Sequence, residues 1–146
     1  MYRYLLLLAP AALLAACQPV GPSANSVPDG AGNAAQAEAP TSLVGEYRVA
    51  GIDGTEVGGQ IGIGLSVTET NIYFEPRCAG FDWTYTYAEG ALTTERPADR
   101  PTCRIAVHPE QQRLAVAIDA VTQAERTPSN GIELTGGGHS VTLFSQ

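Results

Sequence analysis

The chain has 146 residues, of which 44% are hydrophobic, 7% aromatic and 16% charged, a balance that fits one small globular domain with additional sequence. The eight basic residues are all arginine and are outnumbered by fifteen acidic ones, so the formal net charge is -7 at pH 7. A surface of that sign repels nucleic acid and acidic lipid headgroups, which excludes polyanion binding as a function. Sixteen glycines and ten prolines favour strands and turns over a bundle of helices.

The N-terminus has the pattern of an export signal. Arg3 is followed by an apolar stretch, Leu5–Leu14, that is too short for a membrane-spanning helix of about 20 residues. Leu14-Ala15-Ala16-Cys17 resembles the bacterial lipobox. This resemblance implies cleavage after residues 1–16, a diacylglycerol on the Cys17 thiol and acylation of the new N-terminus. Ordinary secretion with an unused thiol is the alternative.

Several acyl chains on one cysteine make membrane attachment effectively permanent. Gln18, rather than aspartate, follows Cys17. In enteric bacteria this pattern resembles that of lipoproteins sent to the outer membrane. We therefore expect a lipid-anchored protein of the cell envelope, in the outer membrane and facing the periplasm.

Residues 17–42 are predicted to form the lipidated cysteine and a linker. From Gln18 to Ser42 the chain has six alanines, four prolines and three glycines, but no aromatic residue, leucine or isoleucine. Such a segment cannot bury a core. We expect it to be disordered, to span roughly 25 to 30 Å as a flexible coil, and to hold the domain away from the membrane.

Residues 43–146 have the size of a single domain and contain two cysteines, Cys78 and Cys103. In an oxidising compartment these two residues are expected to form a disulfide. Closing a loop of about 25 residues stabilises the fold by roughly 3 to 4 kcal/mol. A metal pair or a redox couple is the competing interpretation, but the domain has no C-x-x-C motif and no histidine cluster near the cysteines. We expect no metal and no cofactor.

Segments rich in β-branched and aromatic residues alternate with turn signals and predict short strands. The most regular of them places Phe81, Trp83, Tyr85 and Tyr87 on one face. This aromatic row is either core, which we favour, or a binding face for a hydrophobic ligand, a glycan or a partner's side chain. The predicted strands are Val44–Val49, Ile61–Val67, Ile72–Phe74, Phe81–Tyr87, Ala91–Thr94, Ile132–Leu134 and Val141–Phe144.

One segment has helical spacing. His108 precedes Pro109 at the first helical position, and apolar residues then recur at three- and four-residue steps as far as Ala124. The pattern predicts a single helix over about 109–126. The expected fold class is α+β, with a mostly antiparallel, curved sheet of about seven short strands packed on this helix.

The order of motifs in the domain carries a family resemblance. A glycine-initiated first strand, Gly45–Val49, is followed by Cys78 beside small residues, an aromatic strand that ends at Gly90, the pair Thr102-Cys103, and a helix and hairpin. Together they resemble the META/HslJ-like domain of bacterial envelope lipoproteins, over Leu43 to Gln146. Tyr47 stands where that family usually has tryptophan, and no asparagine follows Cys78. The resemblance implies a role in envelope stress, drug tolerance or secretion and identifies no catalytic residue.

The sequence shows no catalytic motif. It lacks a Gly-x-Ser-x-Gly elbow, and His108 and His139 are interpreted as solvated surface residues at a helix start and in a hairpin turn. Gly59–Gly64 resembles a phosphate loop, but no helix follows it, so a bulged or twisted strand is the better interpretation. The carboxylates that could include an acid–base pair, and that we interpret as solvated, are Asp53, Glu56, Glu69, Glu75 and Asp82.

These patterns favour a non-enzymatic, monomeric lipoprotein that binds or supports another envelope component and is anchored through Cys17. Two alternatives stay open. A periplasmic inhibitor of a protease or lysozyme would insert the loop Glu95–Thr102, held beside Cys103, into the cleft of the enzyme. A small hydrophobic-ligand carrier would need a cavity lined by the aromatic row.

Overall fold

The computed structural model of the chain describes residues 38–58, 61–99 and 102–146, so the predicted signal peptide, Cys17 and the predicted linker up to residue 37 lie outside the described residues. No described helix is long and apolar enough to cross a membrane. The elements of the described ranges are β1 (Gly45–Ile52), β2 (Thr55–Glu56), β3 (Gly64–Val67), β4 (Asn71–Tyr73), the 3-10 helix η1 (Arg77–Ala79), β5 (Asp82–Ala88), β6 (Ala91–Glu95), α1 (Pro109–Ala120), β7 (Gln123–Arg126), β8 (Ile132–Gly136) and β9 (His139–Ser145).

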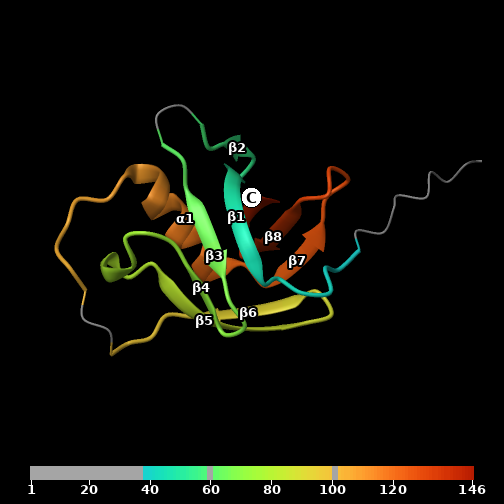
Figure 1. Cartoon of the computed structure of the whole chain (residues 1–146), viewed down its shortest axis with the longest axis horizontal. Coiled ribbons are helices and arrows are strands. Elements are labelled where there is room, and N and C mark those ends of the chain that lie inside the picture. Colours follow the sequence, from blue (N-terminus) through green and yellow to red (C-terminus); the bar gives the residue numbers. More distant parts are fainter. Residues whose placement is uncertain (1–37, 59–60, 100–101) are drawn as a thin grey trace, which may run out of the picture. The chain divides into compact units, whose positions relative to one another are not determined.

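Eight of these strands close into an antiparallel β-barrel, and β2 is an extra strand paired with the end of β1 (Figure 1). From β3 to β9 each strand pairs with the next along the chain, and β1 joins β3 to β9. An antiparallel sheet with one α-helix is thus confirmed, but within the described residues the sheet has nine strands rather than about seven and eight of them close into a barrel, so the fold is mostly β. Closure depends on pairs such as Val49 with Leu143, which lie far apart in the sequence and leave no local signal.

The pairing around the barrel is weakest between β6 and β7. These two strands share one ladder pair, Ala91 with Gln123. Beyond it β6 contacts the helix instead, because the Thr94 hydroxyl donates a 2.8 Å hydrogen bond to the carbonyl of Ile118. We term this join the β6–β7 seam.

Strand alternation fills the barrel with apolar side chains. Phe74 stacks on Phe81, with ring centroids 4.3 Å apart, and lies 5.8 Å from the ring of Trp83. Two residues of the aromatic row, Phe81 and Trp83, are therefore core residues, while Tyr85 and Tyr87 are half-buried against the core. The largest fully buried side chains are Trp83, Phe74, Phe81, Ile52, Leu65, Ile72, Leu114, Ile118, Leu134, Leu143, Val49 and Val121.

Helix α1 lies across one end of the barrel. Arg113 of the helix donates to the carbonyl of Ile52, at the end of β1, whereas Ile118 accepts from β6. β1 and β6 lie on opposite sides of the barrel in the strand order, so a helix that contacts both spans the opening. Its inner face buries Leu114, Ala115, Ala117 and Ile118.

The helix ends at Ala120, so the predicted end at about 126 was wrong. Val121 already has extended backbone angles, φ -68° and ψ 141°, and residues 123–126 form β7 against β8. Val121 and Ala124 are both buried, as the helical spacing required, but Val121 lies at the end of the helix, before β7, and Ala124 lies in β7. Residues three apart lie on opposite faces of a strand, so their spacing carries no signal of the change from helix to strand.

Residues Glu38–Leu43, here termed the N-terminal strap, cross the other end of the barrel. The amide of Arg126 donates to the carbonyl of Glu38 at 2.8 Å, and the hydroxyl of Tyr87 donates to the carbonyl of Pro40. Pro40 and Leu43 are buried. The last residues of the predicted linker are thus part of the folded domain.

Candidate functional site

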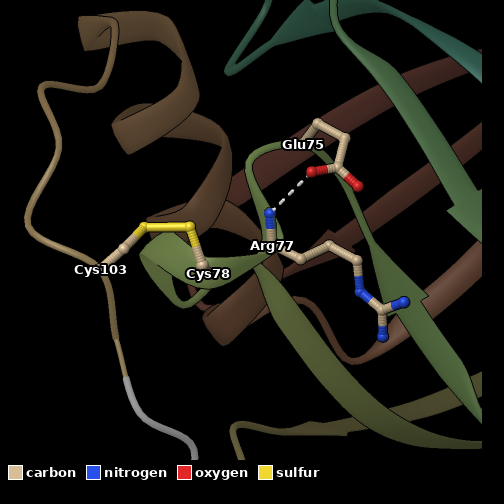
Figure 2. The surroundings of a disulfide bond; sticks show 4 residues. All are labelled: Glu75, Arg77, Cys78 and Cys103. Carbon is tan, nitrogen blue, oxygen red and sulfur yellow. Dashed lines mark hydrogen bonds between the residues drawn. A yellow bond between two sulfur atoms is a disulfide. The ribbon is translucent and has the colours of Figure 1, made fainter.

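Cys78 and Cys103 form the disulfide that the sequence predicts. It joins η1 to the irregular segment that leads from β6 to α1, as Figure 2 shows, and the amide of Cys103 donates to the carbonyl of Cys78 at 2.6 Å. We term the described parts of that segment, Arg96–Asp99 and Thr102–Val107, the clamp segment. Most of its residues are exposed, so the disulfide is a principal link between this segment and the barrel.

A cleft of about 380 Å³ opens between η1 and the clamp segment. Gly80, with φ +88°, ends η1 at this point and allows the chain to turn into β5. We term this hollow the arginine cleft. It is lined by Arg77, Cys78, Ala79, Gly80, Asp82, Arg96, Pro97, Ala98 and Thr102.

Arg77 and Asp82 form an ion pair at one side of the arginine cleft. Nε of Arg77 donates to Oδ2 of Asp82 at 3.0 Å, and Nη2 donates to the same oxygen. The hydrogen bond to Asp82 raises the pKa of Arg77. Asp82 is only 3% exposed and also accepts from the side-chain Nδ2 of Asn71, so its interpretation as a solvated carboxylate was wrong. The guanidinium of Arg77 lies 4.0 Å above the ring of Tyr73 and covers the carboxylate of Asp82.

Arg96 ties the opposite side of the cleft to α1. Its Nε and Nη2 donate to the two oxygens of Asp119 at 2.7 and 2.8 Å, and its Nη1 donates to the carbonyl of Gly80. Asp119 also accepts the indole N–H of Trp83 at 2.7 Å. The arrangement fixes the cleft walls relative to the core.

A second hollow of about 380 Å³ lies between α1 and the turn that follows β1. We term it the histidine pocket, because His139 stands at its edge together with Asp53. Val116 contributes an apolar wall and is 47% exposed. The lining residues are Asp53, Pro109, Gln112, Arg113, Val116 and His139.

Asp53 fixes the orientation of His139. Nδ1 of His139 lies 3.1 Å from both carboxylate oxygens of Asp53, and the amide of Ser140 donates to Oδ1 at 3.0 Å. The hydrogen bond from Ser140, with a smaller contribution from His139, lowers the pKa of Asp53. An ionised carboxylate accepts only, so Nδ1 of His139 carries the proton that it donates.

The other candidate residues do not line these two hollows. His108 lies at the start of α1 as expected, and its side chain accepts from the amide of Glu110. Glu56, Glu69 and Glu75 are exposed, and the carboxylate of Glu75 accepts from the amide of Arg77 at 3.1 Å beside the arginine cleft (Figure 2). Residues 59 and 60 of Gly59–Gly64, which was interpreted as a bulged or twisted strand, lie outside the described residues. The predicted strand Ile61–Val67 is shorter in the structure, because β3 begins only at Gly64. Within the described ranges, no three potential metal ligands lie close enough to hold an ion.

Sequence reasoning missed Arg77 and Arg96 as site residues. Arg77 could have been noticed as a cation next to Cys78, but the pairing of Arg96 with Asp119 depends on the packing of α1. The described residues thus define a disulfide-bonded, closed antiparallel barrel with one helix. No family model, no curated protein and no solved structure matches the chain.

Proposed function

We propose that the chain is a lipid-anchored protein of the cell envelope that has no catalytic role and binds or supports another envelope component. The observation that carries this proposal is the disulfide between Cys78 and Cys103. Cytosolic reductants keep such pairs as thiols, so the bond suits an exported protein. The lipobox-like sequence before Cys17 and the resemblance to the META/HslJ-like domain agree with the same location, in the outer membrane and facing the periplasm.

The arginine cleft and the clamp segment are the surface that we assign to this contact. Large apolar side chains fill the barrel, so a partner would be met on the outside. The disulfide and the bonds of Arg96 hold both walls of the cleft before a partner arrives, which lowers the entropy lost on binding.

Metabolic labelling tests the anchor. Cells that produce the protein are grown with a radioactive fatty acid, and the protein is then isolated. Label is expected on the natural protein and on the Cys78→Ser/Cys103→Ser variant, but not on Cys17→Ser. Equal labelling of natural protein and Cys17→Ser would show that Cys17 carries no lipid.

Site-specific photo-crosslinking in membranes tests the contact surface. A photoreactive residue is placed at Ala98, exposed in the arginine cleft, or at Glu89, exposed in the β5–β6 turn at the other end of the barrel. We expect a discrete adduct from position 98 that position 89 does not give. Absence of any adduct at 98, or the same adduct at both positions, would remove the cleft from the proposal.

Inhibition of an exported hydrolase is a second candidate function, favoured by the way the disulfide pins an exposed segment to a rigid barrel. In the predicted inhibitory loop Glu95–Thr102, residues 100 and 101 lie outside the described residues. Oxidised protein should then inhibit a protease or a lysozyme, and reduced protein should lose this activity. Failure of the oxidised protein to inhibit any of a panel of such enzymes would dismiss this candidate.

A further inference from the structure

The histidine pocket offers one hydrogen-bond acceptor in a fixed position. Because the N–H at Nδ1 of His139 donates a hydrogen bond to Asp53, the neutral form of the imidazole has its lone pair on Nε2. No described residue forms a hydrogen bond with Nε2 at this site. A group that binds to this nitrogen must therefore donate a hydrogen bond rather than accept one.

The backbone around Asp53 holds the acceptor in place before any ligand binds. Asp53 has φ 52°, in the left-handed region that few residues other than glycine adopt. Its amide donates to the carbonyl of Ser140 at 2.8 Å, while its carboxylate accepts from the amide of Ser140. These reciprocal bonds fix the carboxylate, and through it the imidazole ring of His139.

The remainder of the pocket surface is mostly apolar, although Gln112 also lines it and charged residues stand at its edge. Nη1 of Arg113 donates to both oxygens of Glu110, at 3.0 and 2.9 Å, and its Nη2 donates to the carbonyl of Ile52. The guanidinium is thus engaged elsewhere, and the methylene groups of Arg113 are free to contact a ligand beside Val116 and Pro109. A volume of about 380 Å³ fits a molecule built on one ring.

We propose that the histidine pocket binds a small, uncharged apolar molecule that bears a hydroxyl group, of the phenol or alcohol class. Its hydroxyl donates to Nε2 of His139, and its apolar body covers Val116 and Pro109. An anionic ligand is disfavoured because the carboxylate of Asp53 stands at the edge of the pocket. The inference goes beyond the envelope function and does not depend on lipidation of Cys17.

The test is a titration of the purified full-length protein with phenol and with toluene, followed by NMR at pH 8, where an ordinary imidazole is neutral. Toluene has the same ring but no donor. Phenol is expected to shift the Val116 amide and the Nε2 nitrogen of His139 in a saturable way, with at least tenfold higher affinity than toluene. Equal affinities, or no saturable phenol binding, would overturn the proposal.

Two histidine variants complete the test. In His139→Phe a ring remains but the acceptor is lost, so phenol affinity should fall at least tenfold while toluene affinity stays within about twofold. His108→Asn, which retains a side chain able to cap α1, is the matched control and should bind phenol as the natural protein does. Undiminished phenol binding by His139→Phe would refute the assignment of Nε2, and the Nε2 shift in the natural protein gives the same answer if that variant does not fold.

Discussion

The carboxylate of Asp53 receives hydrogen bonds that exist only in the folded chain. Its folded pKa lies below the ordinary value of about 3.9, because Ser140 and His139 favour the ionised form. A lowered folded pKa stabilises the fold at pH values above the unfolded pKa, and this contribution is lost as the pH falls through the folded pKa.

Asp53→Asn should therefore reduce stability at pH 7 and reduce it progressively less as the pH falls below about 4. Urea unfolding of the natural protein and the variant at pH 7, 4 and 3 measures the difference. Glu56→Gln, at an exposed position on the neighbouring β2, is the control. A difference between the natural protein and Asp53→Asn that is the same at all three values of pH would contradict the role assigned to the charge.

At the scale of residues, the sequence indicates which side chains are polar but not which of them form hydrogen bonds with one another in the fold. Asp53 and His139 are 86 positions apart, and only the closure of β1 against β9 brings them together. Asp82 gives a similar lesson. The alternation of its strand predicts that the side chain of Asp82 faces outward, yet the side chain of Arg77, five residues earlier, covers it. The histidine and arginine sites were therefore not predictable as pairs.

At the scale of elements, the disulfide between Cys78 and Cys103 is a principal link between the clamp segment and the barrel. Replacing Cys78 and Cys103 by serine should lower the free energy of unfolding by about 3 to 4 kcal/mol, since the unfolded chain regains the freedom of a loop of about 25 residues. Urea unfolding measures this change. A loss well under 1 kcal/mol would mean that other contacts hold the segment.

The variant with serine at positions 78 and 103 also allows the local opening of the clamp segment to be measured by proteolysis. Arg104 is exposed in the clamp segment, whereas Arg48 is exposed on the paired strand β1. Trypsin should therefore cut after Arg104 at least tenfold faster in the serine variant than in the natural protein, and cleavage after Arg48 should stay slow.

The connection from α1 to β7 is fixed by close contact with the end of β8. Gly136 has φ +150°, and a Cβ built there would lie 2.4 Å from the amide nitrogen of Thr122 and 2.8 Å from the carbonyl oxygen of Ala120. Both are backbone atoms, so neither can move aside cheaply.

We expect Gly136→Ala to destabilise the protein by about 2 kcal/mol or more. Gly62→Ala is the matched control, because a Cβ at Gly62 meets nothing within 4 Å. Thermal unfolding of both variants distinguishes them. An equal melting temperature for the two would show that β8 can shift to accommodate the methyl group.

At the level of elements, most strands were predictable because alternation and turn residues are local signals. The start of α1 was equally visible in His108 and Pro109, and the disulfide followed from the cysteine count. β7 was not predictable, because Val121 and Ala124 continue the helical spacing although the backbone is already extended at Val121 and Ala124 lies in the strand. β2 has only two residues, too few for any periodicity.

At the scale of the whole molecule, the N-terminal strap makes residues before the predicted domain part of the fold. Tyr87→Phe removes the hydroxyl that donates to the carbonyl of Pro40 and should cost about 1 kcal/mol of stability. Tyr73→Phe is the control, since the Tyr73 hydroxyl forms no hydrogen bond with a described residue. Urea unfolding compares the two, and equal stability would mean that the strap does not contribute through this bond.

The β6–β7 seam has a consequence for where the barrel opens locally. Every other pair of neighbouring strands in the cylinder shares at least two ladder pairs, whereas this one shares only Ala91 with Gln123. Separation there breaks the fewest ladder pairs, so we expect spontaneous opening to begin at this join and to expose the interior beside α1 first. Amide protons of Leu92 and Ala124, which bridge the gap, should accordingly exchange with deuterium sooner than those of β1.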